Sequence, residues 1–394
     1  MTKATYDLFV SHSSLTVGAE RSILALAEAS HRQGNRVEVV LPRPGPLEPL
    51  LKASIPRVVI HHSPMQWWMG VDHTGLRGLL KLIQSALHVL PWLRLLKRLS
   101  PDRMIVGSTV VPAPVVAGRL SGIPVVTLLS ESIATNPTLK SVLPKQLIIK
   151  ILKGCSSVTV AVSEFVAAQF HGASMIEPPA IGDLPAVAPP SVRRGTTPRI
   201  VMLGTLSKEK GQLDAVQAVA MARREGVDVT LELYGGSTPT TLAELTARIH
   251  DLGMDDSIFH RGETDEPLQV LRDANVSLVC SRNEAYGRVT AESLLVGTPV
   301  IGYALGGTKE IIASGGGLLV DAHPSALAAA ISEFVVNPDL GRALSQAGAE
   351  RMKSGVGFGD AARAISLIAA AMPRRANGSP RARSRELASR HPAR

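Results

Sequence analysis

Two glutamates eight positions apart, Glu284 and Glu292, are the residues of this sequence best suited to bind a ligand rich in hydroxyl groups. Glu284 follows the apolar run 276–281, and Glu292 lies in the first turns of a predicted helix that begins after Gly287. The first backbone N–H groups of a helix lack partners, and with the positive end of the helix dipole they attract phosphate. A carboxylate in the following turns can accept hydrogen bonds from vicinal hydroxyls, as acidic residues do from ribose. The segment therefore predicts a nucleotide-phosphate site in which Glu284 is free to bind sugar hydroxyls.

Two further loops add small residues and a cation. The apolar run 298–303 is followed by Gly306 and Gly307, whose lack of a side chain lets the backbone approach a ligand closely. Another loop begins at Gly204 and ends at Lys210, where a helix is predicted to start. A lysine at a helix N-terminus opposes the dipole, so a bound anion would account for its position.

The elements that must hold these loops are short strands that alternate with helices. Aromatic residues make up only 3% of the chain, so the cores must be aliphatic, which fits parallel sheets covered by helices. Such sheets bind ligands beyond the carboxyl ends of their strands, which is where these candidate residues lie. The strands are predicted at residues 6–11, 36–41, 57–62, 103–109, 124–130, 157–162, 199–204, 228–234, 258–261, 276–281, 298–303 and 317–320.

A chain of 394 residues is too long for one ordinary core, and a Pro- and Ala-rich stretch divides it. The α/β pattern predicts a Rossmann-like, acceptor-binding domain over 1–185 and a linker over 186–198 that acts as a hinge. A second Rossmann-like domain over 199–372 is predicted to bind the nucleotide, with its last helix able to pack back on the first domain. The two parallel sheets would face each other across a cleft. The basic segment 373–394 has almost no large apolar side chains and is predicted to be disordered.

The segment around the two glutamates resembles the retaining GT-B glycosyltransferases of family 4, also called glycosyl transferases group 1. Their signature is a Glu, seven residues and a second Glu, then a "GtPVI" strand and a "GG..E" loop. This chain has Glu284, Glu292, "GTPVIGYALGG" and Glu310 in the same register. The resemblance covers most of 5–370 and is firm over 199–320. It implies transfer of a sugar, with retention, from a nucleotide-diphosphate donor to a glycan, a lipid-linked acceptor or a small molecule.

The resemblance also implies the roles of individual residues. Lys210 would stabilise the departing diphosphate, and Glu284 would bind the sugar at the catalytic centre. Relatives place an Arg where this chain has Thr205, so Lys208 or backbone donors would have to supply the missing charge. No Asp-rich metal motif is present, and neither a metal nor another cofactor is expected. The donor-binding residues implied are Gly18, Gly204, Thr205, Lys208, Lys210, Arg261, Gly262, Glu284, Tyr286, Gly287, Arg288, Val289, Glu292, Gly306 and Gly307.

The first domain matches the family more loosely. Many relatives carry a His after the strand predicted at 124–130, whereas this chain has Ser130, Glu131 and Ser132. Glu131 is therefore a candidate catalytic contact on the acceptor side, or an ordinary loop carboxylate. The pairs His61–His62 and Trp67–Trp68 could form an acceptor pocket in which aromatic faces stack on sugar rings, or they could be strand-end and core residues.

Charge and cysteine content limit the partners and the compartment. The net charge is +9, but the segment 373–394 holds seven Arg and one Glu, so the rest of the chain carries only +3 and nucleic-acid binding is not expected. Cys155 and Cys280 form no disulfide framework, and no signal peptide or membrane span is predicted, which favours the cytoplasm. The Leu-rich basic stretches 75–99 and 139–153 could lie on an anionic membrane surface at the inner face, or be ordinary helices.

Three other functions remain open at this stage. A GT-B nucleotide-sugar epimerase or a phosphorylase would share the fold, although the complete glutamate signature argues against both. A non-catalytic nucleotide-sugar-binding protein would fit the Thr205 departure and the absent His. A nucleic-acid binder would need the basic segment 373–394 for its affinity.

Overall fold

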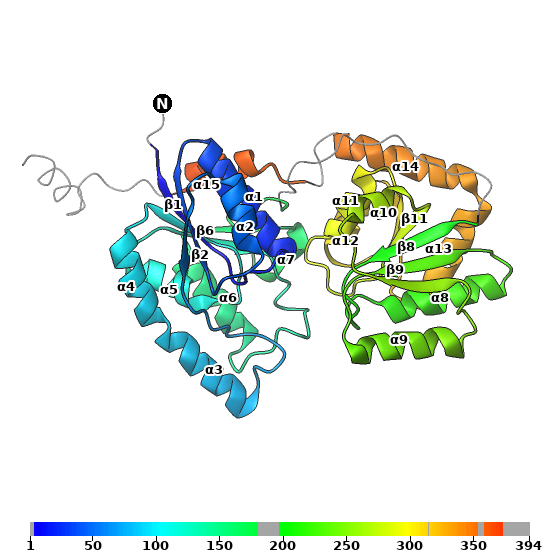
Figure 1. Cartoon of the computed structure of the whole chain (residues 1–394), viewed down its shortest axis with the longest axis horizontal. Coiled ribbons are helices and arrows are strands. Elements are labelled where there is room, and N and C mark those ends of the chain that lie inside the picture. Colours follow the sequence, from blue (N-terminus) through cyan, green and yellow to red (C-terminus); the bar gives the residue numbers. More distant parts are fainter. Residues whose placement is uncertain (1–3, 180–196, 314, 354–357, 373–394) are drawn as a thin grey trace, which may run out of the picture.

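The chain forms two α/β domains that lie side by side in the computed structural model (Figure 1). The structure describes residues 4–179, 197–313, 315–353 and 358–372. Most of the predicted linker 186–198 and the whole of the basic segment 373–394 lie outside these ranges.

The first domain is built on a seven-stranded parallel sheet in the order β3-β2-β1-β4-β5-β6-β7. One face is covered by α1, α2 and α15, and the other by helices that include α4, α5 and α6. Its strands are β1 (Tyr6–Val10), β2 (Arg36–Leu41), β3 (Val59–His62), β4 (Arg103–Val106), β5 (Val125–Leu129), β6 (Val158–Ala161) and β7 (Met175–Ile176). Its helices are α1 (Gly18–Arg32), α2 (Leu47–Ser54), α3 (Gly75–Leu87), α4 (Val89–Leu99), α5 (Pro112–Leu120), α6 (Lys145–Cys155) and α7 (Glu164–Gln169).

The second domain is built on a six-stranded parallel sheet in the order β10-β9-β8-β11-β12-β13. Helices α8, α9 and α13 pack on one face, and α10, α11 and α14 on the other. Its strands are β8 (Arg199–Leu203), β9 (Thr230–Tyr234), β10 (Ile258–Gly262), β11 (Val276–Val279), β12 (Val300–Tyr303) and β13 (Gly317–Val320). Its helices are α8 (Gln212–Arg224), α9 (Pro239–Asp251), α10 (Pro267–Arg272), α11 (Arg288–Leu295), α12 (Gly306–Ile312), α13 (Pro324–Val336) and α14 (Pro338–Lys353).

The predicted fold class, two Rossmann-like domains with parallel sheets, is confirmed. Each predicted strand corresponds to an observed one, and β7 is the strand that the sequence pattern missed. Its two residues are too few to show the periodicity of a strand. In both sheets the strand order reverses beside the first strand of the domain, at β1–β4 and at β8–β11. Ligands of open α/β sheets bind at this point, beyond the carboxyl ends of the strands.

The two domains meet where the start of α7 in the first domain contacts α12 and the loop before α11 in the second. The carboxylate of Glu310 in α12 accepts hydrogen bonds from the backbone N–H groups of Glu164 and Phe165, at the start of α7 in the first domain. The hydroxyl of Ser163 donates to the carbonyl oxygen of Ala285 over 2.6 Å. Figure 1 shows α7 and α12 facing each other at this boundary. Glu310, which belongs to the glutamate signature, is thus used to hold the domains together.

The last helix, α15 (Ala361–Ala371), returns to the first domain and packs against α1 (Figure 1). Arg363 of α15 forms an ion pair of 2.8 Å with the buried carboxylate of Glu177. The side chain of Gln33 donates to the carbonyl oxygen of Ala362 over 2.8 Å. The chain therefore crosses between the domains twice.

One stretch of the described residues, Gly75–Leu99, is long and apolar enough to cross a bilayer by length and composition alone. It comprises two helices, α3 and α4, which meet at His88. In α4 the side chains of Trp92 and Leu96 are completely buried in the core of the first domain. Most of the stretch, however, is not buried inside the fold.

Candidate functional site

The site is built where two loops of the second domain touch backbone to backbone. A Cβ atom on Gly307 would lie 1.9 Å from the carbonyl oxygen of Tyr286, and one on Gly306 would lie 2.2 Å from that of Glu284. Only glycine allows this approach, and Gly306 also has a positive φ of 54°. The N–H of Gly307 donates to the carbonyl oxygen of Glu284 over 2.9 Å. The start of α12 thereby fixes the loop that carries Glu284 into α11.

Lys210 and Glu284 form an ion pair of 2.8 Å at this place. They come from loops after neighbouring strands, β8 and β11, and are brought together because Gly211 packs against the end of β11. A Cβ on Gly211 would lie 2.5 Å from the carbonyl oxygen of Cys280. Both charged side chains keep contact with solvent, with exposed fractions of 37% for Lys210 and 18% for Glu284. The ammonium group is therefore accessible to an anion.

A second ion pair lies at the first turn of α11. The guanidinium of Arg288 binds the carboxylate of Glu292 over 2.8 Å, and it also reaches the carbonyl oxygen of Gly18 in the first domain over 3.4 Å. Gly287, at the N-cap with a φ of 104°, offers no side chain to cap the first N–H groups of this helix. These N–H groups lie between the two ion pairs in sequence, and the phosphate site predicted there stays a prediction.

Tyr286 and Val289, two of the predicted donor-binding residues, have side chains that pack in the interior. The Tyr286 ring is buried in the core that joins the domains, and burial raises the pKa of its hydroxyl. Val289 is half-buried and packs against two core clusters. That Tyr286 and Val289 bind the donor stays a prediction, and with this packing the backbone groups are the ones that could do so.

Thr205 and Lys208, the candidates for the missing charge, are both exposed. Lys208 lines a hollow of about 290 Å³ between the starts of α8 and α9, together with Glu244 and Arg282. The residues that line this hollow include neither Lys210 nor Glu284. The structure thus pairs Lys210 with Glu284, whereas Lys208 lines the neighbouring hollow.

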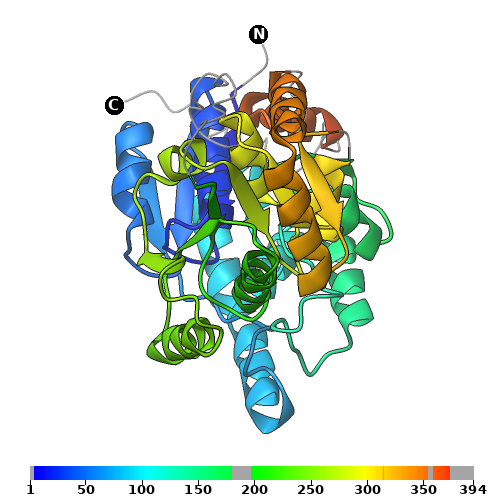
Figure 2. The ribbon, with the colours of Figure 1, turned by 90° about the vertical axis from the view of Figure 1, so that its right-hand side faces the viewer.

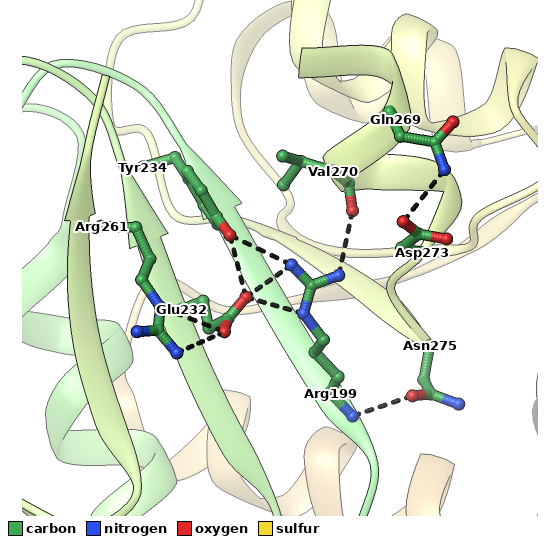
Figure 3. A network of polar contacts seen from close by, with 8 residues as sticks. All are labelled: Arg199, Glu232, Tyr234, Arg261, Gln269, Val270, Asp273 and Asn275. Atoms are coloured by element: carbon green, nitrogen blue, oxygen red, sulfur yellow. Dashed lines mark hydrogen bonds and ion pairs between the residues drawn. The ribbon is translucent and has the colours of Figure 1, made fainter. Parts of the chain in front are cut away.

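Arg261 is part of a polar network that joins three strands of the second sheet (Figure 3). Its guanidinium binds Glu232 over 2.8 Å and lies over the ring of Phe259. Arg199 binds the same carboxylate from the other side over 2.5 Å. Arg261 therefore has protein partners that the sequence pattern did not reveal. The adjacent Gly262 has a φ of 75° and accepts a hydrogen bond from the N–H of Gly235.

In the first domain, Glu131 is bound by its own neighbours. Its carboxylate accepts hydrogen bonds from the hydroxyls of Ser108 and Thr109 and from the N–H of Thr109. These contacts involve both carboxylate oxygens and stabilise the loop after β4. This is the arrangement expected if Glu131 is an ordinary loop carboxylate. They leave the carboxylate less able to bind an acceptor.

The two histidines and the two tryptophans predicted as an acceptor pocket make separate contacts. His61 binds Glu38 over 2.7 Å and His62 binds Glu48 over 2.8 Å, as strand-end residues. Trp68 is buried and donates to the carbonyl oxygen of Thr109. Trp67 is only half-buried, and its ring lies 5.6 Å from that of His12.

Sequence reasoning did not identify His12, which follows β1 directly and lies 3.3 Å from Glu20 in α1. Its position after a strand was the available signal, the same one that pointed to Lys210 and Glu284. Among the described residues, no three His, Cys, Asp or Glu side chains gather closely enough to hold a metal ion. Both cysteines are free thiols, and burial raises the pKa of Cys280.

Comparison with known proteins identifies the family that the second domain resembles. Residues 187–351 match the family model of glycosyl transferases group 1. The D-inositol 3-phosphate glycosyltransferase of Xylanimonas cellulosilytica is 32% identical over 45% of this chain and 44% of its own length. The alpha-maltose-1-phosphate synthase of Mycolicibacterium smegmatis is 30% identical over 39% of this chain and 43% of its own length. The chain thus aligns with less than half the length of each of these curated relatives.

Solved structures match over nearly the whole chain. Anabaena HepE, in complex with UDP and glucose, superposes with a TM-score of 0.74 and 18% identity. The match covers 93% of this chain and 100% of HepE. At this identity the likeness concerns the fold, which is that of the GT-B glycosyltransferases.

The network around Glu232 predicts how stability depends on pH. Burial alone raises the pKa of this carboxyl, but the Arg261 and Arg199 guanidinium groups outweigh burial and hold the pKa below its usual value. A lowered pKa stabilises the fold above the usual value for Glu, and this stabilisation is lost as the pH falls through the lowered pKa. Glu232→Gln should therefore destabilise the protein at pH 7 and flatten the acid side of its melting-temperature profile. An equally steep acid side in the variant, measured by scanning calorimetry, would contradict this assignment.

Proposed function

We propose that the chain belongs to the glycosyl transferases group 1 family, whose model matches residues 187–351, and that it transfers a sugar from a nucleotide-diphosphate donor to a hydroxyl acceptor. The observation that carries the proposal is the Lys210–Glu284 ion pair beside the uncapped start of α11. A cation, free N–H groups and two carboxylates gathered there match the diphosphate, ribose and sugar of such a donor. HepE was solved with UDP and with UDP-glucose, which makes UDP-sugars the first donors to test.

In this proposal the donor diphosphate binds the ammonium group of Lys210 in place of Glu284. Cleavage of the bond between the anomeric carbon and the phosphate oxygen leaves negative charge on the diphosphate. Lys210 and the first N–H groups of α11 stabilise that charge in place, where preorganised donors are most effective. Glu284, released from Lys210, accepts hydrogen bonds from the sugar, and Glu292 accepts them from the ribose.

Retention at the anomeric carbon and independence of metal ions belong to the proposal as well. Retention rests on the match of the glutamate signature to family 4. Metal independence rests on Lys210 and helix N–H groups providing the positive charge that a metal would otherwise supply. Turnover should accordingly persist in EDTA.

We further propose that the acceptor is a lipid-linked glycan and that the protein works at the inner face of a membrane. Helix α3 extends away from the first domain, as Figures 1 and 2 show from two directions. The stretch 75–99 holds five Lys or Arg and no Asp or Glu, which suits an anionic surface. Large apolar side chains along it are exposed, namely Leu76, Leu79, Leu80, Ile83, Leu87 and Leu90. A helix of this composition lies in the membrane interface with its apolar face buried.

The role of Lys210 predicts the strongest effect on turnover. Lys210→Ala should lower sugar transfer or donor hydrolysis about 10²–10³-fold, the range for loss of one preorganised donor at a developing oxyanion. The fold should survive, because Glu284 keeps contact with water. Lys208→Ala is the matched control and should change turnover little, since Lys208 lines the separate hollow beside α9. Turnover above about a tenth of wild type in Lys210→Ala would contradict the role.

Tight donor binding by the wild type without any turnover would instead support a non-catalytic nucleotide-sugar-binding protein. The exposed Thr205, where relatives have Arg, is the observation that favours this second candidate.

The membrane proposal predicts that Leu80→Gln combined with Ile83→Gln weakens binding to phosphatidylglycerol vesicles. Burial of one such side chain is worth about 1.5–3 kcal/mol, so the double variant should lose at least about tenfold in partition coefficient. Leu120→Gln, on an exposed leucine of α5, is the control and should bind like wild type. Vesicle flotation of a chain shortened by 373–394 should still show salt-sensitive binding. If only the full-length chain floats, the basic segment is the anchor and α3 is an ordinary surface helix.

A further inference from the structure

A buried glutamine holds the loop that carries Lys210. Gln212 is the first residue of α8 and is only 4% exposed. Its Nε2 donates to the carbonyl oxygens of Gly204 and Thr205, over 3.2 Å and 3.1 Å. Its Oε1 accepts a hydrogen bond of 3.3 Å from the N–H of Ser207. One amide group inside the fold thus holds three backbone groups of this loop.

The hydrogen bonds to the two carbonyl oxygens determine where the following N–H groups point. A trans peptide is planar, with its C=O and N–H on opposite sides, and the described residues contain no cis peptide bond. Because the Gly204 oxygen points to Gln212, the N–H of Thr205 points away from it. The next peptide follows the same rule, and the N–H of Leu206 donates to the carbonyl oxygen of Gly236 over 2.8 Å.

The peptide between Gly204 and Thr205 is also held by the loop after β9. A Cβ on Gly235 would lie 2.1 Å from the Gly204 oxygen and 2.9 Å from the Thr205 nitrogen. Only glycine allows this approach, and Gly235 has a positive φ of 147°. The carbonyl oxygen of Gly235 is bound in turn by Nε2 of His260 over 3.1 Å. The orientation of this one peptide is therefore determined by packing as well as by Gln212.

The N–H of Thr205 is left free beside Lys210. It donates no hydrogen bond within the described part of the chain, and Thr205 is exposed. The side chain of Lys210 runs along the adjacent Gly204, since a Cβ there would lie 3.7 Å from Cδ of the lysine. The ammonium group of the same lysine forms the ion pair with Glu284. A free N–H in a fixed peptide beside a cation is suited to bind an anionic oxygen.

We propose that the N–H of Thr205 donates a hydrogen bond to the donor diphosphate, and that Gln212 is the positioning residue that orients it. This inference rests on the proposed function and deepens its donor site. The N–H lies where relatives carry an arginine, and it supplies a hydrogen bond in place of that side chain. The bond that breaks is the one described for the proposed function, and its electron pair stays on the diphosphate. The N–H of Thr205 and the ammonium group of Lys210 are preorganised to stabilise that charge.

The test uses the full-length protein and hydrolysis of a nucleotide sugar, in which water takes the place of the acceptor. The donor is chosen by thermal shift of the wild type with UDP-glucose, UDP-N-acetylglucosamine, GDP-mannose and ADP-glucose. Gln212→Leu cannot hold the peptide and should lower kcat about 10²-fold, the lower end of the range for one preorganised donor. Gln217→Leu is the matched control, because it removes the acceptor of an Arg248 hydrogen bond from the same helix, and it should keep the rate.

Gln212→Glu provides a readout that a role in stability alone would not change. The ionised carboxylate repels the oxygens of Gly204 and Thr205, whereas the protonated acid can donate a hydrogen bond to one of them. Burial beside carbonyl oxygens raises the pKa of that carboxyl above its usual value, so a fall in pH produces the donating form. The kcat of Gln212→Glu relative to wild type should therefore rise at least about tenfold between about pH 8 and about pH 5.5. Circular dichroism at each pH checks that both proteins stay folded.

The outcomes separate the two proposals. If the wild type hydrolyses a donor while Gln212→Leu keeps its rate, the role of Gln212 is overturned and the proposed function stands. The same conclusion follows if the relative kcat of folded Gln212→Glu does not change with pH, and this profile decides the matter if Gln212→Leu does not fold. If the wild type neither binds nor hydrolyses any donor of the panel, the proposed function fails and the inference fails with it.

Discussion

The second domain depends on a contact in which two loops meet with no room for a side chain between them. Gly306 and Gly307 approach the carbonyl oxygens of Glu284 and Tyr286 so closely that a Cβ would overlap them. This contact holds the loop that carries Glu284 and sets the start of α11. The Gly211 contact with the end of β11 likewise determines where Lys210 lies. Close backbone packing thus requires glycine at these positions. The same packing fixes the positions of Lys210 and Glu284.

Those fixed positions place a cation beside Glu284 and another beside Glu292. Lys210 binds Glu284 and Arg288 binds Glu292, both over 2.8 Å. A diphosphate is a better partner for a cation than a single carboxylate, since it brings more negative charge and several acceptor oxygens. Exchange of partners on binding would free the carboxylates for hydroxyl groups. The contacts of Arg288 with Gly18 and of Glu310 with α7 connect this exchange to the domain boundary.

Much of this arrangement could be predicted from the sequence, because strand and helix periodicity reveals which residues follow strands. The carboxyl ends of parallel strands meet at one edge, so Lys210 and Glu284 were expected together although 74 positions separate them. Other features depend on tertiary contacts that leave no local pattern. The pairing of Arg261 with Glu232 and the burial of Tyr286 are of this kind.

The central claim is that a nucleoside diphosphate binds at the start of α11 with its ribose on Glu292. Calorimetric titration with UDP and with its 2′,3′-dideoxy analogue tests it most directly, on the wild type and on Glu292→Gln. The wild type should prefer the ribose by about 1–3 kcal/mol, the range for hydrogen bonds to a charged group, and the variant should lose most of that preference. Glu225→Gln, on an exposed residue at the end of α8, should leave it unchanged. A preference for ribose that persists undiminished in Glu292→Gln would contradict the account.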